Sequence, residues 1–184
     1  TGGRRGPVRP SHALMKILHT GDWHAGQTLR RRHRLEELEE VLSEVVTVAR
    51  DEEVDLVLVC GDIFEHSAPS AEAERLVYGA LLELRDAGAT TVILAGNHDN
   101  ARRFGAIEGL MGELGIHVAA QVKRPKEGGI IEILSRDGNE TAQVAALPWV
   151  PERLLFRGEE MMGLQGEHQQ ANAERHTKLV NALC

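Results

Sequence analysis

The chain has 184 residues, the size of one domain or of one domain and a fraction. Hydrophobic residues make up 42% and charged residues 27%, as is usual for globular proteins, which excludes disorder of the whole chain. The net charge of −7 excludes a histone-like protein that binds nucleic acid through overall positive charge. Aromatic residues are only 3% of the chain, which argues against base stacking as the main means of recognition.

Cysteine usage and hydropathy predict the compartment. The two cysteines, Cys60 and Cys184, cannot form a disulfide framework, which favours a reducing environment. No apolar run approaches the roughly 18 residues of a membrane span, and no signal-peptide pattern is present. The sequence therefore predicts a cytoplasmic protein without a membrane partner, in which Cys60 is a packing residue at the end of a strand.

Strands and helices are predicted to alternate after a short leader. Residues 1–14 are rich in Gly, Pro and Arg and are predicted to be disordered, and residues 15–184 are predicted to form one domain. Apolar runs predict buried strands at 15–20, 55–60 and 91–96. Apolar residues at helical spacing predict helices at 33–50, from Ser70 as N-cap to a stop at Gly88, and at about 101–114.

The C-terminal third contains a hairpin signal and a last predicted helix. Apolar and polar residues alternate on both sides of Asp137-Gly138-Asn139, which predicts a β-hairpin. Residues 168–183 are polar and compatible with a helix. The order of strands and helices predicts an α/β fold with right-handed crossovers, in which functional groups gather at the carboxyl ends of the strands.

Polar residues suited to metal binding follow each of the three predicted strands. They form the segments Gly21-Asp22-Trp23-His24, Gly61-Asp62-Ile63-Phe64-Glu65-His66 and Gly96-Asn97-His98-Asp99. The intervals 62 − 22 = 40 and 97 − 62 = 35 residues are each long enough for a strand–helix–strand unit of about 30 residues. We therefore expect these side chains to meet at one edge of the sheet.

The residue types predict a site for two divalent cations. Asp22 and His24 can reach one cation, Asp62 can bridge two, and Asn97 offers a carbonyl oxygen to the second. Oxygen and nitrogen ligands without thiolate suit Mn²⁺, Mg²⁺, Fe²⁺ or Zn²⁺, and a pair of such ions catalyses in-line displacement at phosphorus. His98 follows a ligand and could protonate the departing alkoxide. Glu65 or Asp99 could orient it.

Arginines gather after the first and third of these segments. They are predicted to lie near the mouth of the site, where phosphates must approach. The alternative is that they are solvated residues at the starts of helices. The residues are Arg30, Arg31, Arg32, Arg34, Arg102 and Arg103.

The order Asp-X-His, Gly-Asp and Gly-Asn-His-Asp resembles the calcineurin-like metallophosphoesterase superfamily. The segments MKILHTGDWHAGQTL, GDIFEHSAPS, LAGNHDN and ALPWVPERL are similar to the SbcD family of bacterial nuclease subunits, from Met15 to the C-terminus. The resemblance implies a sandwich of β-sheets flanked by helices. It also implies one His after a later strand and a Gly-His-X-His motif, and neither is found, so the chain is expected to be an incomplete N-terminal portion.

The resemblance also assigns roles to residues. It makes Asp22 and His24 ligands of the first metal, Asp62 the bridge, Asn97 a ligand of the second metal and His98 the catalytic histidine. It favours Glu65 over Asp99 as the residue that orients His98. His66 is interpreted as a surface histidine, and His117, His168 and His176 do not stand in the contexts of the missing ligands.

The implied activity is Mn²⁺-dependent hydrolysis of DNA phosphodiesters. By resemblance this is a 3′→5′ double-strand exonuclease with single-strand endonuclease activity, acting in DNA repair, recombination and replication. The implied partners are DNA, an SbcC-type ATPase subunit and a second copy of the chain. Two alternatives remain: a phosphoesterase acting on a small or cyclic phosphodiester, and a non-catalytic dimerisation or partner-binding module.

Overall fold

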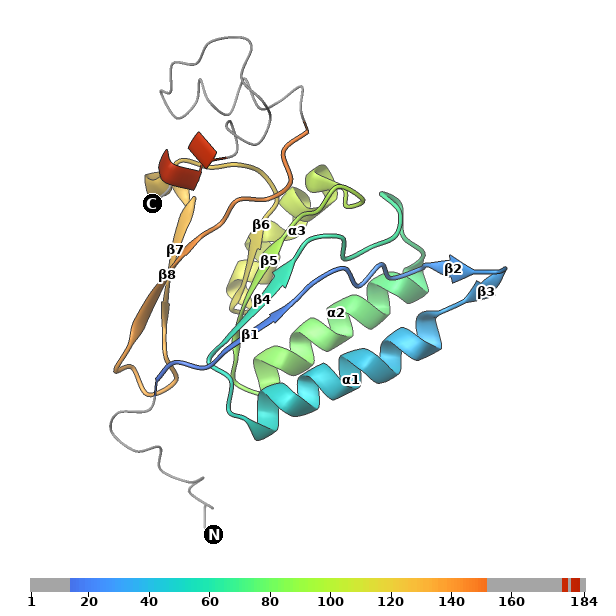
Figure 1. The fold of residues 1–184 in the computed structure, drawn as a ribbon, viewed down its shortest axis with the longest axis horizontal. Coiled ribbons are helices and arrows are strands. Elements are labelled where there is room, and N and C mark those ends of the chain that lie inside the picture. Colours follow the sequence, from blue (N-terminus) through green and yellow to red (C-terminus); the bar gives the residue numbers. More distant parts are fainter. Residues whose placement is uncertain (1–13, 152–176, 179, 183–184) are drawn as a thin grey trace, which may run out of the picture.

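The computed structural model describes residues 14–151, 177–178 and 180–182 (Figure 1). The predicted leader, apart from Leu14, lies outside the described residues. So do most of the predicted terminal helix and its histidines His168 and His176, although residues 177–178 and 180–182 are helical.

A parallel sheet of four strands forms the centre of the protein. Its strands are β1 (Ile17–Thr20), β4 (Leu56–Cys60), β5 (Thr90–Leu94) and β6 (Ile116–Ala119), in this order across the sheet. The helices α1 (Leu35–Asp51), α2 (Ala71–Asp86) and α3 (Ala101–Glu113) connect them. Because the strands follow one another in chain order and parallel crossovers are right-handed, all three helices lie on one face. The predicted α/β fold is confirmed.

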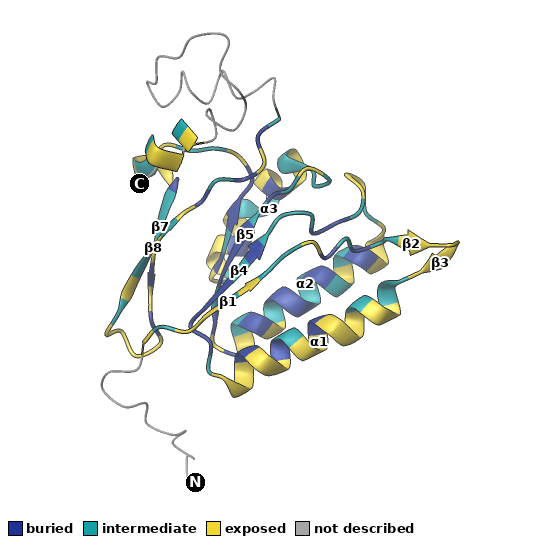
Figure 2. Ribbon diagram, viewed as in Figure 1, coloured by how far each residue is buried: buried dark blue, intermediate teal, exposed yellow. Residues whose placement is uncertain are grey.

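The main core lies between this face and the helices. Figure 2 shows β4 and β5 as largely buried and α1 with a wide exposed outer side. The periodic apolar residues of α1 meet the core at Leu42, Val46 and Ala49, while Val41 is 54% exposed on the outer side. Ser70 caps α2 by accepting the N–H of Ala73, as its sequence predicts.

The predicted hairpin, β7 (Ile130–Leu134) paired with β8 (Thr141–Ala145), covers part of the opposite face of the sheet. Leu56, Val92 and Ile133 form a small second core there. The hairpin turn contains Gly138 at a φ of 71°, a conformation that suits glycine.

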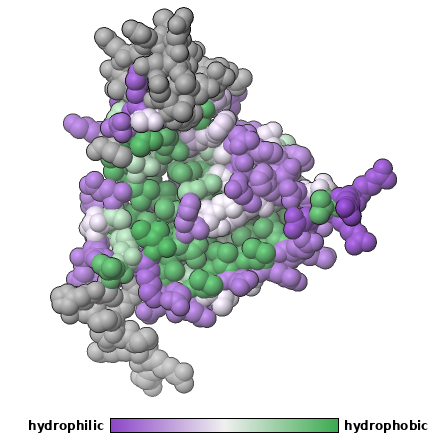
Figure 3. All heavy atoms as spheres, viewed as in Figure 1, coloured by the Kyte–Doolittle hydropathy of each residue, from purple (hydrophilic) through white to green (hydrophobic). Residues whose placement is uncertain are grey.

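The structure differs from the sequence predictions at three places. The first strand is not buried, since residues 17–20 at the sheet edge alternate between exposed and half-buried. Figure 3 shows apolar surface on the viewed face between the β7–β8 hairpin and α1. Strand β6 was not predicted. The helix predicted from residue 33 begins at Leu35, because the short strands β2 (Thr28–Leu29) and β3 (Arg32–His33) form a hairpin before it.

The described part also contains the one-turn 3₁₀ helix η1 (Pro125–Glu127), which lies before β7. Among the described helices, none has the length and hydropathy needed to cross a membrane.

Candidate metal centre

The carboxyl ends of β1, β4 and β5 bring the three polar segments together, as their spacing predicts. Main-chain hydrogen bonds join the segments in series. The N–H of Asp22 donates to the carbonyl of Gly61 (3.1 Å) and that of His24 to the carbonyl of Asp62 (2.9 Å). The N–H of Gly61 donates in turn to the carbonyl of Leu94 (3.1 Å). The loops are therefore one connected structure.

Three of the expected metal ligands have left-handed backbone conformations. The φ angles are 52° at Asp22, 46° at His24 and 47° at Asp62. Such conformations cost roughly 1–3 kcal/mol each in residues other than glycine, and they cluster at functional sites. Here the hydrogen bonds between the loops hold these conformations in place.

Glycine is required where the loops approach most closely. A Cβ atom at Gly96 would lie 2.1 Å from the main-chain nitrogen of Asp62 and 2.2 Å from its Oδ1. A Cβ atom at Gly21 would lie 2.6 Å from the carbonyl oxygen of Cys60. The glycines that precede Asp22 and Asn97 thus let the ligand loops pack against each other.

Asp22, His24 and Asp62 form a group suited to one cation. Nε2 of His24 lies 3.9 Å from Oδ1 of Asp22 and 3.9 Å from Oδ2 of Asp62. The three ligand atoms lie within 4.8 Å of one another. Two carboxylates and an imidazole nitrogen are a ligand set for Mn²⁺, Fe²⁺ or Zn²⁺, so these residues fit the predicted divalent metal.

Glu65 lies next to the ring nitrogen of His24 that does not face the aspartates. Its Oε2 is 2.9 Å from Nδ1 of His24, and both atoms are buried. Their approach does not meet hydrogen-bond geometry, so neither atom has a hydrogen-bond partner among the described residues. A carboxylate at one ring nitrogen of a histidine, with a metal at the other, is the usual support of a metal-binding histidine. The contact differs from the expected one, in which the Glu65 carboxylate orients His98.

His98 is held between the same residues. Its main-chain N–H donates to Oδ1 of Asp62 (3.1 Å), and its Nδ1–H donates to the main-chain carbonyl of Glu65 (2.9 Å). Its ring lies edge-on to that of His24, with the centroids 4.9 Å apart. The Glu65 carbonyl, and then the nearby carboxylates of Asp62, Glu65 and Asp99, raise the pKa of His98. With Nδ1 occupied, Nε2 is left as the nitrogen that can exchange a proton with a substrate.

Asp99 connects the second and third loops. Its carboxylate accepts the N–H groups of Phe64 (2.9 Å), Ile63 (3.2 Å) and Gly96 (2.8 Å). A carboxylate that receives three main-chain donors fixes the relative position of both loops. Its contacts therefore point to a loop-holding role.

Asn97 is exposed and lines a hollow of about 390 Å³ together with Asp22 and Asp62. Leu147, Pro148 and Trp149, which follow β8, also line this hollow. In the sequence, the Leu-Pro-Trp segment contributes to a family resemblance but predicts no role. Its position could not be read from local pattern, because it reaches the site from another part of the chain.

The arginines that were predicted to lie near the mouth of the site are found in two elements. Arg30, Arg31 and Arg32 are exposed in the β2–β3 hairpin, and Figure 3 shows this hairpin ending in a hydrophilic projection. Arg102 is exposed at the start of α3, and Arg103 forms an ion pair with Glu74.

His66 and His117 belong to neither group of possible metal ligands found among the described residues. His66 is exposed, as interpreted, and His117 lies within β6. Arg34 precedes α1 and forms an ion pair with Glu37.

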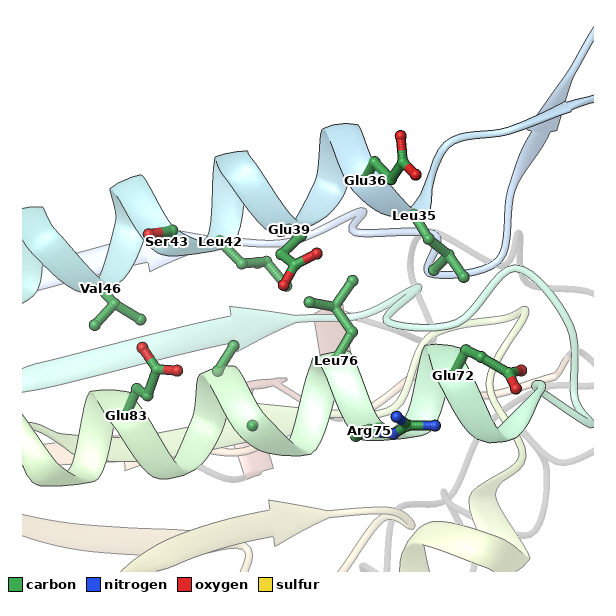
Figure 4. Close-up of a pocket in the computed structure, with 12 residues that line it drawn as sticks. Leu35, Glu36, Glu39, Leu42, Ser43, Val46, Glu72, Arg75, Leu76 and Glu83 are labelled. Carbon is green, nitrogen blue, oxygen red and sulfur yellow. The ribbon is translucent and has the colours of Figure 1, made fainter.

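A second hollow, of about 430 Å³, lies between α1 and α2 (Figure 4). Leu42, Val46 and Leu76 form its apolar part, and glutamates such as Glu39 and Glu83 stand at its edge. It is slightly larger than the first hollow but contains none of the candidate metal ligands, so it is not part of the candidate metal centre.

The loops of the parallel sheet hold the Asp-X-His, Asp and Asn-His segments together at one edge, an arrangement that suits a metal-dependent phosphoesterase. Comparison of the sequence with family profiles agrees with this class: the profile described as calcineurin-like phosphoesterase matches residues 15–156. The chain belongs to the calcineurin-like phosphoesterase family.

Within that family the chain is a homologue of SbcD nuclease subunits. It is 47% identical over 105 residues to the SbcD subunit of the SbcCD nuclease of Bacillus subtilis (strain 168), covering 56% of this chain and 27% of the relative. It is 41% identical over 143 residues to the SbcD subunit from Rhodobacter capsulatus, covering 74% of this chain and 35% of the relative.

A more distant match is the DNA double-strand break repair protein Mre11 of Methanopyrus kandleri, 37% identical over 94 residues. The match covers 50% of this chain and 21% of that relative. The chain thus spans well under half the length of the curated relatives it matches, as expected for an N-terminal portion.

Proposed function

We propose that this protein hydrolyses DNA phosphodiester bonds in a metal-dependent reaction, as an SbcD-type 3′→5′ double-strand exonuclease and single-strand endonuclease. The observation that carries the proposal is that the carboxylates of Asp22 and Asp62 lie beside Nε2 of His24. His98 is held next to this group by its hydrogen bond to Asp62. The names of the relatives, which include nuclease subunits and a DNA double-strand break repair protein, support the choice of DNA.

The candidate ligands would hold two divalent cations. Asp22, His24 and Asp62 would hold one divalent cation, and Asp62 and Asn97 would contribute to a second. Bound cations of this kind activate water and neutralise the charge that develops on the phosphate. Mn²⁺ is the proposed metal and Mg²⁺ or another divalent ion is the alternative.

His98 would act on the leaving group. The hydrogen bond from its Nδ1 to the Glu65 carbonyl fixes the ring orientation and keeps the proton on Nδ1. The raised pKa of His98 increases the fraction of the ring that is protonated near neutral pH, which suits donation of a proton from Nε2 to the departing alkoxide.

The proposed partners and setting follow the homology. We propose an SbcC-type ATPase subunit and a second copy of the chain as protein partners, with roles in DNA repair, recombination and replication. The relatives are named as one subunit of an SbcCD nuclease, which supports a complex of unlike subunits. The two cysteines, too few for a disulfide framework, support a cytoplasmic setting. The exposed Arg30, Arg31 and Arg32, and Arg102 with Arg103, are the proposed contacts to DNA phosphates.

The experiment is hydrolysis of linear duplex DNA by the protein with Mn²⁺, comparing wild type with His98→Asn. We expect degradation by wild type and a loss of about 100-fold or more for His98→Asn, the usual contribution of a general acid. The matched control is His66→Asn, an exposed histidine in a neighbouring loop, which should keep the wild-type rate. Equal rates for wild type and His98→Asn would overturn the assignment of His98.

A parallel assay with bis-p-nitrophenyl phosphate separates the substrate classes. A nuclease is expected to prefer DNA strongly over this small diester. Hydrolysis of the small diester with no hydrolysis of DNA would identify a phosphoesterase for small or cyclic diesters. Absence of both activities, together with dimer formation, would favour the non-catalytic module.

A further inference from the structure

The hollow beside the metal ligands has an aromatic side that the proposed reaction does not use. Trp149 lines it together with Asp62 and Asn97 and is 55% exposed. Among the Trp, Tyr and Phe side chains that the structure describes, only Trp149 is exposed. The other tryptophan, Trp23, is 7% exposed. A large indole left in water next to a hollow of ligand size is typical of binding sites.

The backbone holds Trp149 firmly although its side chain is exposed. Its N–H donates to the carbonyl of Ala95 (2.8 Å), one residue before the Gly96-Asn97 loop. Pro148 and Val150 on either side are buried, and the proline ring fixes its own φ angle. The segment is therefore anchored to the metal loop, and an aromatic group on an anchored backbone loses little conformational entropy when a ligand binds.

The chemistry of the hollow indicates what would contact the indole. Its lining divides into the carboxylates of Asp22 and Asp62, which suit cations and through them a phosphate, and the apolar residues Leu147, Pro148 and Trp149. A nucleotide has this same division, since its base is separated from the phosphate by one sugar. Aromatic side chains bind bases of any sequence by stacking on their faces.

We propose that Trp149 is a stacking platform for the nucleobase adjacent to the phosphate held at the metal ligands. This subsite rests on the proposed DNA hydrolysis and deepens it. The subsite predicts that the enzyme binds a base that is unstacked or single-stranded. Duplex ends that fray and single strands offer such bases.

The test measures the affinity of the protein for two single strands of equal length in Mn²⁺, an oligothymidylate and an abasic deoxyribose-phosphate strand. His98→Asn is the common background, so that the strands are not cleaved during the measurement. Trp149→Leu keeps an apolar side chain but removes the ring, and Trp149→Phe keeps a ring. Leu134→Ala changes another exposed apolar residue, 59% exposed in β7, outside the hollow.

Stacking predicts that Trp149→Leu weakens oligothymidylate binding by about 5- to 150-fold and leaves abasic-strand binding within about twofold. Trp149→Phe should recover most of the affinity, and Leu134→Ala should behave like the background. The urea midpoint of each variant checks folding, and the main-chain bond to Ala95 is available to all of them.

Two results would overturn the subsite while leaving DNA hydrolysis intact: Trp149→Leu binds oligothymidylate as tightly as the background, or it loses both strands equally. If the background binds neither strand and wild type does not cleave DNA, the proposed function itself fails. The two failures are therefore distinguishable.

Discussion

The carboxylate of Glu65 lies 2.9 Å from Nδ1 of His24, while Nε2 of the same ring faces Asp22 and Asp62 at 3.9 Å. A proton on Nδ1 next to this carboxylate leaves Nε2 with its lone pair toward the two aspartates. We infer that Glu65 prepares His24 for metal binding, and that it reaches His98 through its main-chain carbonyl.

Substitution of Glu65 should therefore weaken metal binding. Glu65→Gln removes the charge at Nδ1 and keeps the side-chain volume. We expect the Kd for Mn²⁺, measured by calorimetric titration, to rise about 10-fold or more, the usual effect of losing such a support. Glu40→Gln, an exposed glutamate of α1, is the control and should leave the Kd unchanged. An unchanged Kd in Glu65→Gln would contradict this role.

Two glycine substitutions should have opposite effects on stability. A Cβ at Gly96 would collide with the main-chain nitrogen of Asp62, so Gly96→Ala should lower the free energy of unfolding by about 1–3 kcal/mol. Gly109 lies in α3 with open space around its Cβ position, so Gly109→Ala should raise it by about 0.5–1 kcal/mol. Urea unfolding of both variants measures the difference. Similar shifts in both would show that the loops do not pack as described.

The link between the sheet and the hairpin depends on Asp55, which is 1% exposed. Its carboxylate accepts the main-chain N–H groups of Lys16 (2.7 Å) and Arg136 (2.9 Å). Asp55→Ala removes both acceptors and should cost about 1–3 kcal/mol of unfolding free energy in urea. Asp51→Ala, at the exposed end of α1, should cost much less. Equal losses of unfolding free energy in the two variants would contradict this role of Asp55.

His117 should make stability depend on pH. Its partial burial in β6 disfavours the charged ring and lowers the pKa of His117 in the folded protein below that of the unfolded chain, about 6.5. The unfolded state therefore binds more protons between the two pKa values. The free energy of unfolding therefore falls as the pH drops from about 6.5 toward the pKa of His117 in the folded protein, and above about pH 6.5 this loss is absent. His117→Gln should flatten this part of the profile, measured as urea midpoints from about pH 5 to about pH 7.5. An unchanged slope would contradict it.

Local sequence was sufficient where the structure is local. Ser70 as N-cap, the hairpin around Gly138 and the core positions of α1 follow from periodicity and turn chemistry alone. The strand–loop spacing also sufficed to predict that Asp22 and Asp62 meet, because parallel strands bring their carboxyl ends together.

Long-range placement could not be predicted in the same way. The target of the Glu65 carboxylate depends on side-chain orientation across two loops, and the position of Trp149 depends on the path of the chain after β8. The exposure of β1 depends on its place at the sheet edge, which no apolar run reports. The hairpin before α1 contains Arg30 and Arg31 at φ angles of 49° and 67°, where sequence preferences favour Asn or Gly.

We propose that Asp22, His24 and Asp62 bind one divalent cation, and titration of the protein with Mn²⁺ tests this binding most directly. Asp62→Asn is the variant, because it keeps an oxygen for the N–H of His98 but removes the charge. We predict saturable Mn²⁺ binding by wild type and binding at least about 10-fold weaker in Asp62→Asn, while the unchanged urea midpoint shows that the fold is kept. Equal Mn²⁺ affinity in the two proteins would contradict the metal centre.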